Sequence, residues 1–143
     1  MARPEFAPVF EALRRLLEPY ANRPGFAHTD AVGKYQLSST TKADRVGRPL
    51  FVAGVQVNRT YVSYHLMPIY MNPALQRAVP PALKRRMQGK SCFNFTSIDP
   101  ELMRALSALT AEAIASFKEV TLPWDDRRTA KKAKARPRSR GGA

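Results

Sequence analysis

The stretch LFVAGVQVNRTYVSYHLM, residues 50–67, decides the fold. It contains two runs rich in valine, tyrosine and other strand-forming residues, 50–57 and 60–67, separated only by Asn58-Arg59. A two-residue turn there predicts a β-hairpin in which one face is mainly apolar and the other half-polar. The predicted apolar-face pairs are Val57–Thr60, Val55–Val62, Ala53–Tyr64 and Phe51–Leu66. The predicted pairs of the other face are Gln56–Tyr61, Gly54–Ser63, Val52–His65 and Leu50–Met67.

Patterns on both sides of the hairpin predict the remaining elements. Apolar residues at helical spacing predict a first helix over residues 6–20 and a final helix that starts at Asp99-Pro100. Residues 34–40 and 92–97 alternate as strands do, and two short helices are expected over 72–79 and 80–87, the second capped by Gly89. The polar stretch around His28, and residues 30–33 after it, are expected to be loop.

This order of elements predicts an α+β domain. The expected sheet is antiparallel and has about four strands, a three-strand meander plus one, packed with an N-terminal and a C-terminal helix. The helices should cover one face of the hairpin, because that face carries the largest apolar side chains. These are Phe51, Val55, Val62, Tyr64 and Leu66.

Length and composition exclude several classes of protein. A chain of 143 residues, 44% of them hydrophobic, is long enough for one folded domain. One cysteine and two histidines allow neither an internal disulfide nor a four-ligand zinc site. No apolar run approaches the roughly 18 residues that a membrane helix needs, and charges near Met1 argue against a signal peptide. We therefore expect a cytoplasmic protein with no membrane contact.

The charge gathers at the C-terminal end of the chain. Between residues 127 and 143 all the charged side chains are basic. No apolar residue there is larger than alanine, so residues 123–143 predict a disordered basic tail after a domain over 1–122. Such a tail can contact phosphates of any nucleic-acid sequence. The candidate nucleic-acid-binding residues are Arg127, Arg128, Lys131, Lys132, Lys134, Arg136, Arg138 and Arg140.

Residues 34–115 resemble the YdhG-like family, small bacterial domains of unknown function. The resemblance rests on GRPLFVAGV (47–55), YVSYHLMP (61–68), GKSCFNF (89–95) and the final helix. Residues 35–40 depart from it, because relatives usually carry a Ser-Trp-Gly-Met-Pro type of strand there. Some members are described as frataxin-like iron chaperones, which implies a ridge of carboxylates. The first helix interleaves its acids with arginines, so the iron role is not carried over, and no metal or cofactor is expected.

The half-polar hairpin face is the second candidate site. A face of this kind can line a cleft for a small ligand, or it can be an ordinary sheet surface with a structural histidine. Its candidate ligand-binding residues are Gln56, Tyr61, Ser63, His65 and Asn94. Cys92 is expected to be a half-buried, inert thiol, and Asp99 a helix cap. With no nucleophile, base and acid near one another in sequence, no catalytic residue is predicted.

The sequence therefore predicts a small non-enzymatic binding domain whose tail contacts nucleic acid without sequence preference. The alternative is a small-ligand-binding domain that uses the hairpin face, with the tail incidental. The physiological partner and the oligomeric state stay open.

Overall fold

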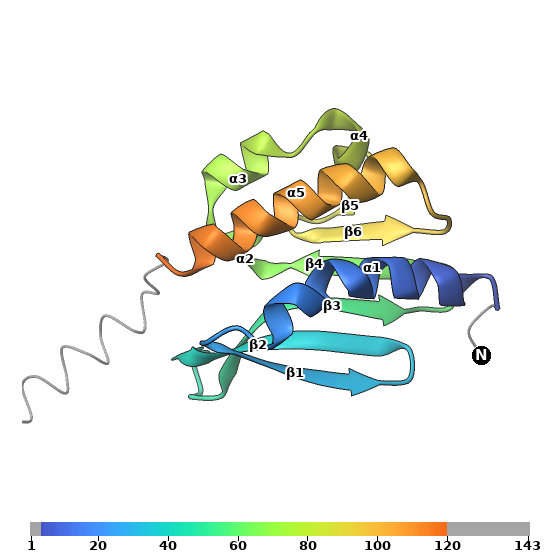
Figure 1. The fold of residues 1–143 in the computed structure, drawn as a ribbon. Coiled ribbons are helices and arrows are strands. Elements are labelled where there is room, and N and C mark those ends of the chain that lie inside the picture. The colour runs from blue at the N-terminus through green and yellow to red at the C-terminus, as the bar shows by residue number, and fades with distance from the viewer. Residues whose placement is uncertain (1–3, 120–143) are drawn as a thin grey trace, which may run out of the picture.

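A computed structural model of the chain describes residues 4–119, which form five helices and a six-stranded antiparallel sheet. Figure 1 shows the sheet with its strands in the order β1-β2-β3-β4-β6-β5. The strands are β1 (Phe26–Ala31), β2 (Lys34–Ala43), β3 (Pro49–Val57), β4 (Val62–Leu66), β5 (Met87–Gln88) and β6 (Cys92–Phe95). The helices are α1 (Phe6–Ala21), α2 (Met67–Met71), α3 (Pro73–Ala78), α4 (Pro81–Lys84) and α5 (Pro100–Phe117).

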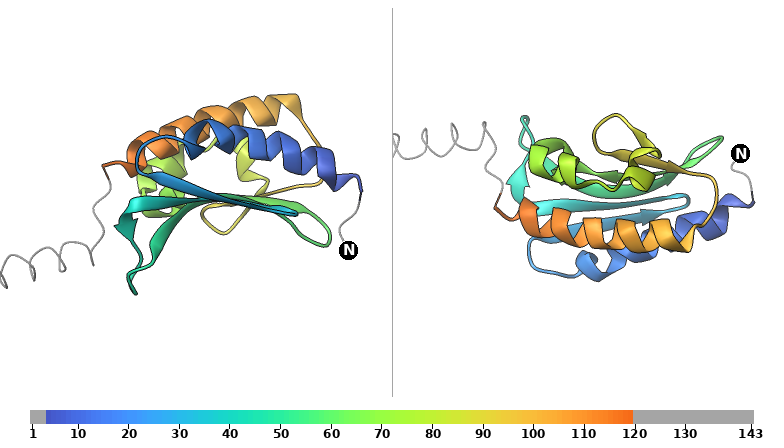
Figure 2. Two further views of the ribbon diagram at one scale, coloured as in Figure 1. Left: turned by 60° about the horizontal axis from the view of Figure 1, so that its bottom comes forward. Right: turned by 90° about the horizontal axis from the view of Figure 1, so that it is seen from above.

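Two long helices cover one face of the sheet. Figure 2 shows α1 and α5 side by side in one layer above the strands, with the short helices on the far side of α5 from α1. Each long helix turns an apolar stripe toward the sheet, as the helical spacing predicts. Alternate residues of the strands are buried against these helices, and Leu37, Tyr64 and Phe93 are fully buried. The opposite face of the sheet carries no helix in the described part of the chain.

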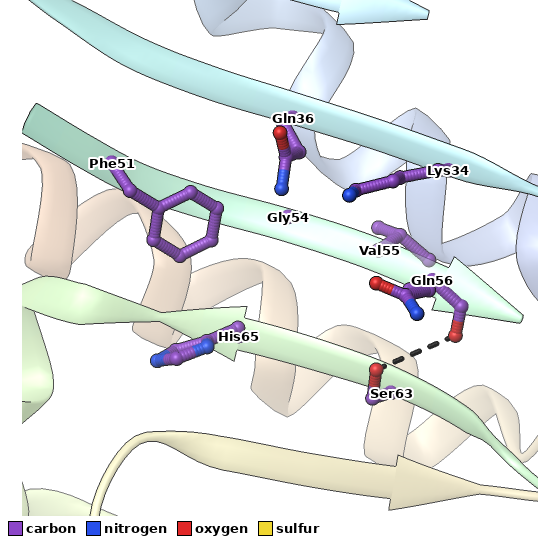
Figure 3. Close-up of a pocket in the computed structure, with 8 residues that line it drawn as sticks. All are labelled: Lys34, Gln36, Phe51, Gly54, Val55, Gln56, Ser63 and His65. Carbon is purple, nitrogen blue, oxygen red and sulfur yellow. Dashed lines mark hydrogen bonds between the residues drawn. The ribbon is translucent and has the colours of Figure 1, made fainter. Parts of the chain in front are cut away.

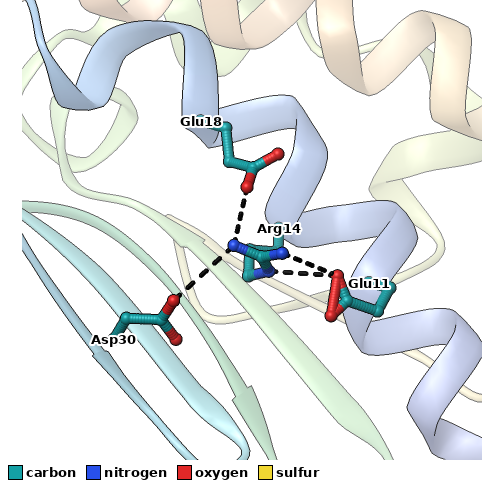
Figure 4. Close-up of polar contacts among 4 residues, drawn as sticks. All are labelled: Glu11, Arg14, Glu18 and Asp30. Carbon is teal, nitrogen blue, oxygen red and sulfur yellow. Dashed lines mark hydrogen bonds and ion pairs between the residues drawn. The ribbon is translucent and has the colours of Figure 1, made fainter.

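An ion-pair cluster ties α1 to the outer strand β1 (Figure 4). The Arg14 guanidinium lies 3.0 Å from a Glu11 carboxylate oxygen and 2.6 Å from one of Glu18. It also reaches across to the Asp30 carboxylate on β1, at 3.6 Å. Asp30 therefore lies on the side of β1 that faces α1 (Figure 4).

The α+β class and the antiparallel sheet are confirmed, but the expected number of strands, about four, is too low. β1 was not predicted, because most of its residues are exposed and its sequence shows no alternation of apolar and polar residues. β1 is one of two strands outside the prediction. The other, β5, has only two residues. Gly89 is not a helix cap: its φ of 77° lies in the turn between β5 and β6. His28, expected in a loop, lies on β1.

The predicted hairpin exists, but its register was wrong by two residues. Val57 pairs with Val62 and Ala53 with Leu66, so the connection has four residues, 58–61. The Asn58 N–H donates to the Tyr61 C=O at 2.8 Å and closes this loop. A two-residue turn would need a positive φ at Arg59, which arginine disfavours, whereas a longer loop does not. Because the shift is an even number, each β4 residue keeps its predicted face.

A register shift in β3 moves Phe51 to the face opposite the one predicted. Leu37 pairs with Ala53, but the next β2 residue, Ser38, pairs with Phe51, so Val52 is an extra residue. Val52 and Ala53 are in consequence both fully buried under the helices. Phe51, expected in the core, instead lies beside His65 on the uncovered face, with the ring centroids 5.1 Å apart. Val52, predicted to lie opposite His65 on that face, is a core residue.

The domain boundary predicted at residue 122 and the predicted disordered tail 123–143 lie outside the described residues.

Candidate ligand-binding face

The uncovered face of the sheet is built from two cross-strand rows of mainly polar side chains. The register places them directly opposite one another across five strands. The first row is Thr29, Gln36, Gly54, His65 and Cys92. The second row is Ala31, Lys34, Gln56, Ser63 and Asn94. Within these rows Lys34 is the one charged side chain apart from the titratable His65, and no carboxylate is present.

A shallow hollow of about 100 Å³ lies between the two rows, over β2, β3 and β4 (Figure 3). Its floor is Gly54, which has no side chain to fill the gap. A Cβ at this position would meet the Phe51 ring at 3.0 Å and the Tyr35 carbonyl oxygen at 3.3 Å, so larger residues fit poorly. Its lining residues are Lys34, Gln36, Phe51, Gly54, Val55, Gln56, Ser63 and His65.

Two nitrogen donors face this floor from β2. Figure 3 shows the Lys34 ammonium and the Gln36 side-chain nitrogen turned toward Gly54. Neither side chain bonds to another group within residues 4–119, so both are available to a ligand. Lysine supplies three N–H donors and no acceptor, and the glutamine amide supplies two more donors.

His65 forms the opposite wall and is held in place on two sides. Its Nε2 lies 2.7 Å from the Ser91 hydroxyl, and Phe51 packs edge-on against its ring. Burial lowers the pKa of the His65 imidazole, which favours the neutral ring near pH 7. When the Ser91 hydroxyl donates to Nε2, the ring proton resides on Nδ1 and that nitrogen becomes a further donor.

The residues beside the hollow bond mainly to one another. Asn58 donates to the Ser63 hydroxyl at 3.2 Å and accepts from the Gln56 amide at 3.3 Å. Asn94, one position beyond Ser63 in the second row, donates to the Gln88 side-chain oxygen at 2.8 Å. These bonds hold the second row in place, and Lys34 is the polar member of the row whose side chain has no partner within residues 4–119.

No family model matches the chain, and comparisons with curated proteins and with solved structures gave no match. The YdhG-like resemblance therefore stays a prediction.

The structure brings together three of the five predicted ligand-binding residues. Gln56, Ser63 and His65 line the hollow, and Asn94 lies beside it. Tyr61 does not reach it, because the four-residue loop removes Tyr61 from the position opposite Gln56, which Ser63 takes. The eight basic residues predicted to bind nucleic acid, Arg127 to Arg140, lie outside the described part of the chain.

The predicted site did not include five residues that line the hollow: Lys34, Gln36, Phe51, Gly54 and Val55. Lys34 and Gln36 could have been found by continuing the meander from the hairpin to residues 34–40, because strand alternation puts them on the face of Gln56. Phe51 gave no such signal, since its place depends on the extra residue Val52.

The reactive groups of this face are a hydroxyl–imidazole pair and a thiol. Ser91 and His65 form a hydroxyl–imidazole pair, but Ser91 is only 6% exposed and no carboxylate contacts His65 among residues 4–119. Burial raises the pKa of the Cys92 thiol, which disfavours the reactive thiolate. Within the same residues no three His, Cys, Asp or Glu side chains gather as metal ligands do, and no helix there is both long and apolar enough to cross a bilayer.

A second hollow, of about 500 Å³, lies between α4 and the start of α5. Arg85 and Arg86 line it together with Asp99 and Glu101, so opposite charges share its wall. The Asp99 carboxylate already accepts from the N–H groups of Glu101 and Leu102, as predicted for a helix cap. This balance makes the hollow a weaker anion site than the two described rows of the sheet face, which contain no carboxylate.

Proposed function

We propose that this protein is a non-enzymatic binding domain that holds the anionic group of a small ligand over Gly54. The carrying observation is a pair of donors, Lys34 and Gln36, turned toward the hollow and without a side-chain partner among residues 4–119. The two rows that they belong to contain no carboxylate. A cation among hydrogen-bond donors attracts an anion, and the hollow of about 100 Å³ suits a carboxylate or phosphate group better than a large ring.

The hydrogen bonds around the hollow support the same proposal. Ser91 orients the His65 ring, and Asn58 orients Gln56 and Ser63, so the wall is formed before a ligand arrives. A wall that is already ordered loses less side-chain entropy on binding than a mobile one.

The test is a titration of the full chain with inorganic phosphate and with acetate, followed by two-dimensional amide NMR. We expect saturable shifts at Gly54, Gln36 and the Gln56 side-chain amide, and none with chloride at equal ionic strength. Lys34→Met should weaken binding at least tenfold, because it removes the one ammonium group among the described residues that line the hollow.

Lys42→Met is the matched control, since the Lys42 ammonium lies 5.6 Å from the Phe117 ring centroid and outside the hollow. It should leave the affinity unchanged. Saturation by neither anion, or equal losses in both variants, would refute the proposed site.

A second candidate function is sequence-independent contact with nucleic acid through residues 127–140. The supporting observation is in the sequence, where eight basic residues and no acidic one fall within that segment. Polybasic segments gain affinity by releasing counterions from phosphates, and this gain falls as the salt concentration rises.

Fluorescence anisotropy with a short duplex DNA and an unrelated RNA tests this candidate. The full chain should bind both at low salt with a steep salt dependence, and a chain truncated after Asp126 should lose most of that affinity. Equal binding by the two chains would show that residues 127–140 are not needed and that the nucleic acid binds the described domain, where Arg85 and Arg86 are exposed. Absence of binding by the full chain would eliminate this function.

A further inference from the structure

The two outer strands of the sheet differ in length. At one edge β5 has only two residues, whereas at the other β1 has six. β1 pairs with β2 in an unbroken register, and Figure 1 shows no other described element beyond it. Proteins commonly protect long edge strands with charged side chains, proline or a bulge. Residues 26–31 contain no lysine, proline or bulge, and their one charge, Asp30, lies 3.6 Å from Arg14 of the same chain. Within residues 4–119, β1 is therefore an edge strand that another strand can join.

The hydrogen bonds define which residues of β1 face outward. The Thr40 N–H donates to the Gly25 C=O at 2.8 Å, and the pair 25–40 continues the register of β1 with β2. Because bonded positions alternate along an antiparallel strand, Ala27, Thr29 and Ala31 bond to β2. His28 and Asp30 then direct their N–H and C=O groups away from the sheet.

We propose that β1 pairs antiparallel with β1 of a second copy of this chain, with Thr29 of each copy at the two-fold axis. In this register His28 of one copy and Asp30 of the other form bonded pairs, one on either side of the axis. Each pair joins two outward-facing N–H groups to two outward-facing C=O groups, as an antiparallel ladder requires.

Side-chain complementarity selects this register over its neighbours. An imidazole N–H lies opposite a carboxylate twice, whereas a shift that pairs Asp30 with itself opposes two carboxylates. Asp30 keeps Arg14 at 3.6 Å, which adds a positive group to each cluster (Figure 4). Ala27 and Ala31, both small, face each other on the uncovered side. Val32 is fully exposed in the single chain, and the proposed register places it opposite Phe26 of the second copy.

Disulfide trapping tests the register directly, in a Cys92→Ser background so that the native thiol is silent. Thr29→Cys should form a covalent dimer in a glutathione redox buffer, because residues opposite each other at a non-bonded position have Cα atoms about 4.5 Å apart. Ala31→Cys should not, since its counterpart lies four residues along the strand, about 13 Å away. An equimolar mixture of Ala27→Cys and Ala31→Cys chains should cross-link where neither does alone.

Sedimentation equilibrium of chains that retain Cys92 provides a second readout. His28→Lys should tighten the dimer and His28→Asp should weaken it at least tenfold, because these place an ammonium or a second carboxylate opposite Asp30. A register pairing His28 with itself would reverse the lysine effect. Circular dichroism checks that each variant is folded.

Three results would overturn the proposal. One is a Thr29→Cys chain that stays monomeric in the redox buffer, and another is cross-linking of Ala31→Cys alone. The third is a native chain that stays monomeric in sedimentation equilibrium at high protein concentration.

Discussion

Tyr64 joins the sheet to the helix layer through a buried hydrogen bond. Its side chain is fully buried, and its hydroxyl lies 2.6 Å from the Thr110 Oγ1 on α5. Thr110 uses its own proton to donate to the Leu106 C=O at 2.7 Å, so the Tyr64 hydroxyl is the donor between the two. Burial raises the pKa of the Tyr64 phenol well above its ordinary value, because the phenolate would have no water around it.

Tyr64→Phe should therefore change both stability and its dependence on pH. At pH 7 the loss of one buried hydrogen bond should cost about 1 kcal/mol in the free energy of unfolding. The pKa of Tyr64 is higher in the folded than in the unfolded chain. Its contribution is accordingly present below about pH 10, where the unfolded tyrosine titrates, and is lost as the pH rises further.

Urea unfolding of the native chain and the variant, at pH 7 and at alkaline pH, measures both effects. The stability difference between the two should shrink or reverse in alkali. Parallel pH profiles would show that ionisation of Tyr64 does not limit stability there.

Single residues also show where sequence analysis fails. The faces of Gln56, Ser63 and His65 were predictable, because strand alternation preserves them through an even shift in register. The position of Phe51 was not, because one extra residue in β3 reverses the face of everything before it. Tyr61 was misplaced for another reason: the length of the loop depends on backbone angles at Arg59 that composition alone does not set.

Among the elements, α5 has a clear sequence signal with a local cause. Asp99 accepts from the N–H groups of Glu101 and Leu102 at 3.0 and 3.4 Å, and Pro100 occupies the first turn. Both features were visible in the sequence, because capping is a contact between near neighbours. By contrast, β1 is held by pairing with β2 and by Arg14, and its own residues carry little strand signal.

Asp99→Ala should lower the free energy of unfolding by about 1 kcal/mol, because it exposes N–H groups that the carboxylate now satisfies. Asp99→Asn is the matched control: it keeps the acceptor oxygen and removes the charge. It should retain most of the stability in urea unfolding curves. Equal losses in the two variants would show that the charge beside Arg85 and Arg86 matters more than the cap.

For the whole molecule, the sequence predicted the class of fold better than the extent of the sheet. The α+β class follows from helical stripes and strand alternation, which are local properties. The number of strands does not follow from local properties, because β1 and β5 are stabilised by pairing with β2 and β6 and show little strand pattern of their own. The candidate site was predicted in part for the same reason: its β4 wall comes from the hairpin, and its donors come from the neighbouring strand.

The two-residue strand β5 also limits how far this sheet can grow. Pairing at β1 would use the one long edge of each copy, and the remaining edges would be too short to recruit another strand. Assembly would then stop at two copies instead of propagating into a fibre, because a two-fold contact leaves no second complementary edge. A protein with an exposed strand would in this way stay resistant to polymerisation at high concentration.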